Sequence, residues 1–287
     1  MQKEHFPQTV SLSSFWSTFI AMARKELIIM ARYPVNFVAS FGQVFLTVAV
    51  FTLAGRLFYD APAEQSGLSN GSNPAGLVVY GFVLYLFLND TLWSIGYNVR
   101  NEQVQGTLEQ LYLSPASKFA NLVARIVNIL IWTGLLTIAG GALMAAIIGR
   151  LPVENPLLGL YLFILTLMGT FGVGFAFAAL TLQIKETAQT LANLLQFAFL
   201  VLCANFFPFA ALPPFLLKIS RLIPLAYAVD AFRSTLMGFP DGFPELAPFR
   251  VEFWIVTIFG LVMPFLGYYL YRASERKARK EGSLSNY

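Results

Sequence analysis

Long stretches without charged side chains dominate the pattern of this chain. Five runs carry no charge and a sixth carries only Asp90; the six runs are residues 33–55, 76–99, 126–149, 155–184, 187–217 and 253–271. A helix of roughly 20 apolar residues crosses the hydrocarbon core of a bilayer. Each run has about that length or more, so the pattern predicts six membrane-spanning helices.

An amphipathic segment, residues 13–31, precedes the first run. Lys25 and Arg32 lie on one face of the predicted helix, and the apolar residues recur at helical spacing on another. The apolar face consists of Trp16, Phe19, Ile20, Ala23, Leu27 and Met30. Such a helix suits the membrane interface; a cytoplasmic helix packed on other protein is the alternative.

The segment between the last two runs, residues 206–249, is rich in proline. It contains seven prolines, and its apolar pieces, residues 215–223 and 225–237, are too short to cross a membrane. We expect short re-entrant helices that dip into the outer leaflet and return; an ordinary outside loop is the alternative. The residues of this segment that we single out are Pro208, Pro213, Pro224, Tyr227, Asp230 and Arg233.

The composition agrees with a membrane protein and excludes several kinds of site. Hydrophobic residues make up 57% of the chain and charged residues 12%, about half the charged share of a globular domain. One cysteine, Cys203, excludes an internal disulfide, and one histidine, His5, excludes a histidine-rich metal site. We expect no catalytic, cofactor-binding or metal-binding residues in this chain.

The net charge of +4 is best interpreted as a topology signal. Most Lys and Arg residues fall in segments that lie inside if both termini are cytoplasmic, and the cluster from Arg272 to Lys280 follows the last run directly. We therefore expect cytoplasmic termini and no nucleic-acid partner. The chain is predicted to be one all-α transmembrane domain, with an interface helix in residues 1–34, a six-span bundle in 35–272 and a basic cytoplasmic tail in 273–287.

The inside connection between the second and third runs, residues 100–118, is polar yet patterned like structure. Gly106 can end one helix, and Thr107 with Gln110 forms a capping box for the next. Ser114 and Pro115 then stop that helix after about two turns. A short capped helix at the mouth of two spans can transmit force from a docked partner.

This connection carries a family resemblance. The run from Glu102 to Pro115 resembles the cytoplasmic signature of ABC-2 type transporter permeases, and the stretch from Phe207 to Arg233 resembles that family's segment between its last two spans. The six-span plan and the amphipathic lead helix match as well. The resemblance implies a permease that pairs with a second copy of itself as a homodimer and with two copies of a separate ATPase subunit.

The resemblance also implies which residues contact the ATPase. The short helix would be the coupling helix, and we expect Glu102 and Glu109 to meet basic or polar groups of the ATPase. A second contact is expected at the turn between the fourth and fifth runs. The predicted coupling residues are Glu102, Gly106, Thr107, Leu108, Glu109, Leu111, Pro115, Lys185 and Glu186. The chain contains no phosphate-binding loop, so ATP and Mg²⁺ are expected on the partner subunit.

Residues that line a transport pathway are harder to select. Asp90 is the clear charge inside a span, where charges are costly and default to functional hypotheses. Asp230 and Arg233 are three apart on a short helix, which favours a local ion pair. The candidate pathway residues are Phe41, Phe45, Asp90, Phe197 and Phe206; lipid-facing phenylalanine is the alternative for the aromatic ones.

These observations favour an export permease in a bacterial or archaeal plasma membrane. It would move an amphipathic or lipid-like compound, such as a drug, a lipid or a lipid-linked glycan, outward with ATP hydrolysed by the partner. An ion-coupled carrier would need several ionisable residues within the membrane, and a membrane-embedded lipid-modifying enzyme would need clustered acids or bases at one face. The sequence does not identify the cargo.

Overall fold

The computed structural model describes residues 12–59, 74–97, 118–148, 151–184 and 187–280. All regular structure in these residues is helical, as predicted, and no strand occurs among them. The helices are α1 (Leu12–Arg32), α2 (Pro34–Tyr59), α4 (Pro74–Thr91), the π-helix η1 (Leu92–Tyr97), α7 (Lys118–Ile148), α8 (Pro156–Ile184), α9 (Ala188–Leu202), the short 3₁₀-helix η3 (Phe209–Ala211), α10 (Pro214–Ser220), α11 (Pro224–Leu236) and α12 (Phe249–Lys280).

Within the described residues, four helical segments are long and apolar enough to cross a membrane. They are Gly76–Gly96, Val123–Leu143, Pro156–Ile184 and Phe249–Ala278. They coincide with four of the six predicted runs, so the chain is a multi-pass membrane protein. The remaining two runs correspond to α2 and α9, and the count of six spans stays a prediction.

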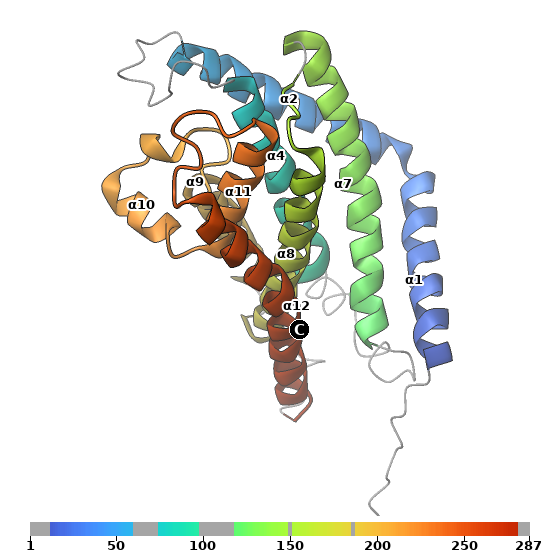
Figure 1. Cartoon of the computed structure of the whole chain (residues 1–287). Helices are drawn as coiled ribbons and strands as arrows, with labels where there is room; N and C mark the ends of the chain where they lie inside the picture. The colour runs from blue at the N-terminus through green and yellow to red at the C-terminus, as the bar shows by residue number, and fades with distance from the viewer. Residues whose placement is uncertain (1–11, 60–73, 98–117, 149–150, 185–186, 281–287) are drawn as a thin grey trace, which may run out of the picture.

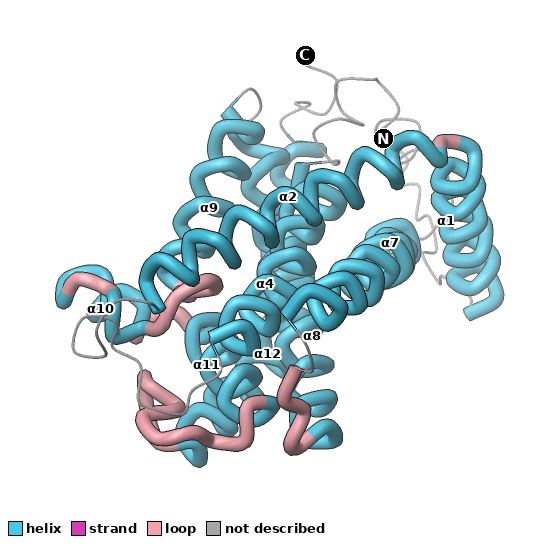
Figure 2. Tube along the Cα trace, turned by 90° about the horizontal axis from the view of Figure 1, so that it is seen from above, coloured by secondary structure: helices cyan, strands magenta, loops and turns pink. Residues whose placement is uncertain are grey.

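The first two helices are arranged differently from the predicted layout. Figure 1 shows α1 alongside α7, whereas α2 runs across one end of the bundle, and Figure 2 shows the same transverse course of α2 from above. An apolar stripe such as that of α1 can be covered by a neighbouring helix as well as by a membrane surface. The interface position of α1 and the spanning role of α2 are therefore not confirmed.

The fifth run is shorter as a helix than its charge-free length indicated. We predicted a span within residues 187–217, but α9 ends at Leu202. Ala204 adopts φ +45°, which breaks the helix, and the Asn205 side chain donates to the Phe199 carbonyl at 3.0 Å. The backbone at Asn205 also lies against Gly81 of α4, where a Cβ would stand 1.9 Å from the Asn205 carbonyl oxygen. These contacts fix the end of α9 at Leu202, 16 residues before the next charged residue, Lys218.

Helices α8 and α12 pack closely because glycines face each other across their contact. A Cβ at Gly172 would lie 2.3 Å from the Met263 carbonyl carbon, and one at Gly267 would lie 2.1 Å from the Gly172 carbonyl oxygen. A Cβ at Gly169 would lie 2.2 Å from the Phe259 ring. The glycines at 169 and 172 thus serve close helix packing, which is what small residues in apolar helices commonly do.

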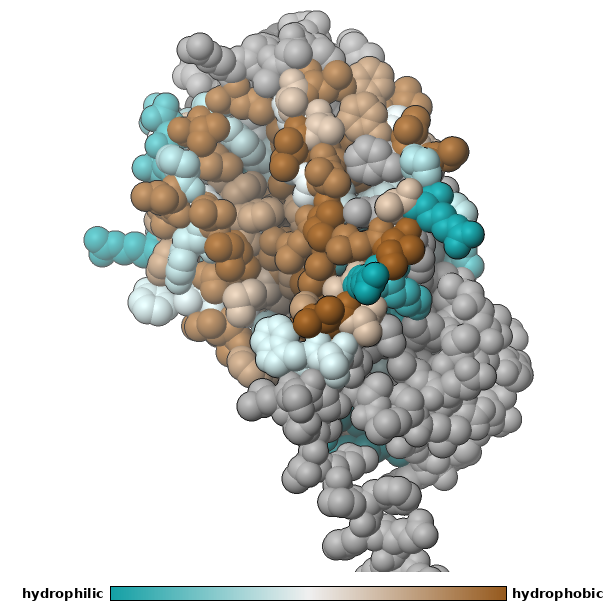
Figure 3. Space-filling model, turned by 90° about the vertical axis from the view of Figure 1, so that its right-hand side faces the viewer, coloured by the Kyte–Doolittle hydropathy of each residue, from teal (hydrophilic) through white to brown (hydrophobic). Residues whose placement is uncertain are grey.

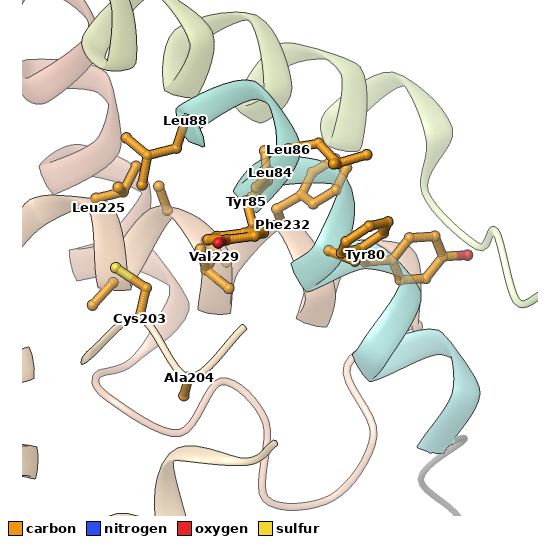
Figure 4. Packing of buried hydrophobic residues seen from close by; sticks show 14 of the residues in the cluster. Tyr80, Leu84, Tyr85, Leu86, Leu88, Cys203, Ala204, Leu225, Val229 and Phe232 are labelled. Carbon is orange, nitrogen blue, oxygen red and sulfur yellow. The ribbon is translucent and has the colours of Figure 1, made fainter. Parts of the chain in front are cut away.

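The proline-rich segment forms two short helices, α10 and α11, as expected. Pro214 and Pro224 occupy the first positions of these helices, where a missing N–H costs nothing. Helix α11 is buried along almost its whole length and packs against α4, α8 and α12. Figure 4 shows Leu225, Val229 and Phe232 of α11 in the core beside Tyr80, Tyr85 and Cys203. Protein therefore covers α11, which a re-entrant helix requires, while its depth in the membrane stays a prediction.

Apolar side chains cover much of the outer surface. Figure 3 shows a largely hydrophobic face on the side of α1 and α7, with hydrophilic residues at its margins. The large apolar residues exposed on these two helices are Trp16, Ile20, Ile28, Leu130, Leu135 and Ile138. Such a surface suits lipid or a protein partner within the membrane.

The two ends of the described chain lie together. The start of α1 and the end of α12 are at the same end of the molecule, which is the lower end in Figure 1. Helix α12 extends to Lys280, so the first part of the predicted basic tail continues the helix. The side of the membrane on which this end lies, and the division into interface helix, bundle and tail, remain expectations.

Candidate functional site

The predicted coupling residues lie outside the described residues. These residues are Glu102, Gly106, Thr107, Leu108, Glu109, Leu111, Pro115, Lys185 and Glu186, which fall in the segments 98–117 and 185–186. The structure describes the helices on both sides of these segments: η1 and α7 flank the first, and α8 and α9 flank the second. The contacts of these flanking helices therefore show which parts of the chain a movement of the two segments would reach first.

The π-helix η1 is held by two neighbouring helices just before residue 98. Arg125 of α7 donates from Nη1 to the Ser94 carbonyl at 3.0 Å, and its side chain is buried. Thr181 of α8 donates from Oγ1 to the Gly96 carbonyl at 3.2 Å. A displacement of η1 must consequently be passed to α7 and α8.

Two further polar contacts extend this connection. Gln196 of α9 accepts from Trp93 Nε1 of η1 at 3.3 Å and donates to the Tyr85 hydroxyl of α4 at 2.9 Å. Gln183 of α8 donates to the Ser274 hydroxyl of α12 at 2.8 Å. Six helices, η1, α4, α7, α8, α9 and α12, are thus linked by side-chain hydrogen bonds.

The predicted pathway residues do not share one environment in this chain. Phe206 is buried, with its ring centroid 5.7 Å from that of Phe82 and 5.9 Å from that of Tyr85. Phe41 is partly buried against the core. Phe45 is 38% exposed and Phe197 is 62% exposed. Their roles in a pathway stay predictions, because a pathway between two permease copies would involve surfaces of both.

Asp90 faces α7. Its carboxylate accepts a hydrogen bond from the Thr133 hydroxyl of α7 and one from the side chain of Asn89. Asn89 and Asp90 are both half-buried. The acid is thus held at the contact of two candidate spans. Its role in transport stays a prediction.

The re-entrant residues are brought together around α11. Asp230 and Arg233 form the predicted ion pair, with Oδ1 and Nη2 3.9 Å apart, and both side chains are fully buried. Arg233 also donates to the carbonyls of Ala204 at 2.8 Å and Phe207 at 3.2 Å, next to Pro208. Arg233 therefore joins α11 to the segment that leaves α9, which is more than a local pair would do.

The proline and tyrosine positions of the segment have backbone roles. Pro208 precedes η3 and Pro213 precedes α10, both in extended conformation. Pro224 begins α11. The Tyr227 hydroxyl donates to the Arg221 carbonyl at 2.9 Å, which ties α11 to the turn after α10.

Two acids that sequence reasoning missed complete the buried group. Asp230 Oδ2 accepts from the backbone N–H groups of Glu245 at 2.7 Å and Leu246 at 2.8 Å. The Glu245 carboxylate accepts from the Ala210 N–H at 2.7 Å, and Glu252 accepts from the Ala247 N–H at 3.2 Å. We call Asp230, Arg233, Glu245 and Glu252 the buried charge cluster. It connects four stretches of chain on the side opposite the coupling segments.

The cluster contains three acids and one base. Burial raises the pKa of both Asp230 and Glu245, and the Arg233 guanidinium opposes this effect. The Asp230 and Glu252 carboxyl groups contact each other through a side-chain hydrogen bond, whereas Glu245 Oε1 has no hydrogen-bond partner among the described residues. Buried carboxyl groups of this kind stay protonated to a higher pH than exposed carboxyl groups do.

The described residues contain no group of three or more His, Cys, Asp and Glu side chains that could hold a metal ion. Glu245 and Glu252 had no usable sequence signal, because they follow Asp230 by 15 or more positions across a loop. Only the fold shows that these acids meet.

The comparisons with known proteins agree with the geometry. The family described as ABC-2 type transporter matches residues 17–237. This range contains the segment 98–117 and the re-entrant residues up to Met237. A search of the curated proteins found no match.

Proposed function

Because the chain belongs to the ABC-2 type transporter family and is a membrane permease component of an ABC transporter, we propose that it forms the export pathway of a transporter driven by a separate ATPase. The observation that carries the proposal is the extent of the family match, which covers 17–237 and so includes both predicted functional segments. The chain would work in a bacterial or archaeal plasma membrane with both termini cytoplasmic.

The segment 100–118 would receive the mechanical work. Its short helix, around Thr107 to Leu113, would dock in a cleft of the ATPase, with Glu102 and Glu109 toward basic or polar groups. The anchoring of η1 supports this role, since Arg125 and Thr181 join η1, which ends at Tyr97 just before the segment, to α7 and α8. Lys185 and Glu186, between α8 and α9, would supply a second contact.

The cargo would be amphipathic or lipid-like: a drug, a lipid or a lipid-linked glycan. The extensive apolar surface of the chain supports assembly within the membrane, and we expect two permease copies with two ATPase copies. Phe41, Phe45, Asp90, Phe197 and Phe206 are the proposed pathway residues. The chain would bind no cofactor itself, and ATP with Mg²⁺ would bind the partner.

The test replaces Gly106 and Thr107 by proline in the full chain, purified with its ATPase. Proline at position 107 removes the predicted capping side chain and favours extended backbone at position 106, so we expect cargo-stimulated ATP turnover to be abolished while membrane insertion is retained. The matched control places two prolines at Ser69 and Asn70, in the connection between the first two charge-free runs, which lies outside if the termini are cytoplasmic, and should leave turnover unchanged. Unchanged turnover in the Gly106 and Thr107 variant would refute the coupling assignment.

A further inference from the structure

Helix α10 exposes a face that combines large apolar side chains with basic ones. Phe215 is 72% exposed, and Leu222, in the turn after the helix, is 82% exposed. Lys218 and Arg221 lie between them in the sequence and are also exposed. Positions 215, 218 and 222 follow one another at intervals of three and four residues, which is the spacing of one helix face. We call these four side chains the α10 surface.

The opposite side of α10 fixes the orientation of this surface. Leu216, Leu217 and Ile223 are partly buried and pack against the hydrophobic core. The Arg221 carbonyl accepts from the Tyr227 hydroxyl of α11 at 2.9 Å, which holds the turn after α10 in place. The α10 surface therefore cannot turn inward without loss of these contacts.

Helix α10 lies at the edge of the molecule. Figures 1 and 2 both show it on the side opposite α1, where it packs against α9. Leu194 and Val201 of α9 are exposed as well, so apolar surface continues on the neighbouring helix. Because α9 begins beside the predicted inner turn at 185–186 and ends at Leu202, the α10 surface follows at the predicted outer end of the helices.

The two bases of the α10 surface have no acidic partner in the part of the chain that the structure describes. Asp230 pairs with Arg233 there, and neither Lys218 nor Arg221 takes part in an ion pair. Two unpaired cations attract an anion, but a soluble anion would leave Phe215 and Leu222 in water. A phospholipid supplies a phosphate group directly above its acyl chains, so it suits the bases and the apolar side chains together.

We propose that α10 is an interfacial lipid-binding helix that selects anionic phospholipids. Phe215 and Leu222 enter the boundary of the acyl chains, and Lys218 and Arg221 extend to the phosphate groups, as long basic side chains do at membrane surfaces. An anionic lipid is favoured over a zwitterionic one because no choline cation lies beside its phosphate to oppose the two bases. The inference goes beyond the proposed function, since neither ATP nor cargo takes part.

The test places a fluorophore on the α10 surface of the full chain. Leu222→Cys can be labelled selectively with a nitrobenzoxadiazole reagent, because Cys203, the one native cysteine, is fully buried. The labelled chain enters nanodiscs of mixed phosphatidylcholine and phosphatidylglycerol. A spin-labelled acyl chain, which quenches the fluorophore on contact, is carried by one lipid or by the other at the same mole fraction. We expect spin-labelled phosphatidylglycerol to quench at least about three-fold more strongly.

Variants of the labelled chain separate the bases from the apolar side chains. Lys218→Gln with Arg221→Gln should remove the preference for phosphatidylglycerol and keep quenching by both lipids. Neither base has a protein partner, so this double variant should unfold in detergent at the temperature of the parent chain. Phe215→Ser should weaken quenching by both lipids. The matched control is Lys277→Gln, at an exposed position near the other end of α12, and it should keep the preference.

Three results would overturn the proposal. Equal quenching by the two lipids would mean that the bases select no head group. Absence of quenching by either lipid would mean that the α10 surface lies in water or against protein. A preference that survives Lys218→Gln with Arg221→Gln in a folded chain would place the selection elsewhere.

Discussion

At the residue scale, Arg233 is the central side chain of the buried charge cluster. Its guanidinium donates to two carbonyls of the segment after α9, lies 3.9 Å from Asp230 and sits over the Phe209 ring at 5.2 Å. No other base is paired with the cluster acids among the described residues. The free energy of unfolding should therefore depend strongly on this one residue.

Arg233→Met should lower the stability of the folded chain by about 3–5 kcal/mol, because it leaves buried acids without their counter-charge. Thermal unfolding of the purified chain, followed by loss of tryptophan fluorescence, measures the effect. The control is Arg221→Met, at an exposed position of the same segment. Equal unfolding temperatures for the two variants would show that the buried cluster does not hold the re-entrant segment.

Glu245 provides a pH-dependent test of the same cluster. Burial raises its pKa above 4.5, so the folded chain binds this proton more tightly than the unfolded chain does. That contribution favours the folded state at low pH and is lost as the pH rises above 4.5, through the raised value.

Glu245→Gln should therefore raise the unfolding temperature at about pH 8 and change it little at about pH 4. The glutamine oxygen can still accept from the Ala210 N–H, so the backbone contact is retained. A gain of the same size at both pH values would contradict the assignment, because it would not depend on ionisation.

The residues also show where sequence reasoning reaches its limit. The three-residue spacing of Asp230 and Arg233 predicted their pair correctly, since a helix fixes local neighbours. Glu245 and Glu252 join the pair through the loop before α12, and no local pattern encodes such a contact. The same holds for Arg125, whose side chain donates to the Ser94 carbonyl across 31 positions of the chain.

At the scale of elements, the glycine contact between α8 and α12 gives a direct prediction. Gly172→Val should destabilise the chain by about 1–3 kcal/mol, because the new side chain would overlap the backbone of α12 at Met263. Gly134→Val in α7 is the matched control, since a Cβ there would meet nothing within 4 Å. Thermal unfolding compares the two variants. A loss in Gly134→Val as large as in Gly172→Val would argue against specific close packing.

Hydropathy alone located the long helices but not every helix end. The runs at 76–99, 126–149, 155–184 and 253–271 became candidate spans because length and composition suffice to recognise them. The helix end at Leu202 within the run at 187–217 was not predicted, since the polar turn at Asn205 is uncharged and its contact with Gly81 is tertiary. Pro208 and Pro213 were the residues of this run that indicated a helix end before residue 217.

At the scale of the whole molecule, the two regions to which we assign a function lie on opposite sides of the bundle. Helices η1, α7, α8 and α9 flank the predicted coupling segments, and the buried charge cluster braces the re-entrant segment at the other side. Helices α4 and α8 run between the two regions. This arrangement gives the proposed work of the ATPase a continuous helical route through the chain.

The central claim is that a separate ATPase powers transport by this chain. The most direct measurement is cargo uptake into inside-out proteoliposomes that contain the purified chain with or without its ATPase. The account predicts accumulation of the amphiphilic cargo only when both polypeptides and Mg²⁺-ATP are present. Accumulation by the chain alone, without a second polypeptide, would contradict it.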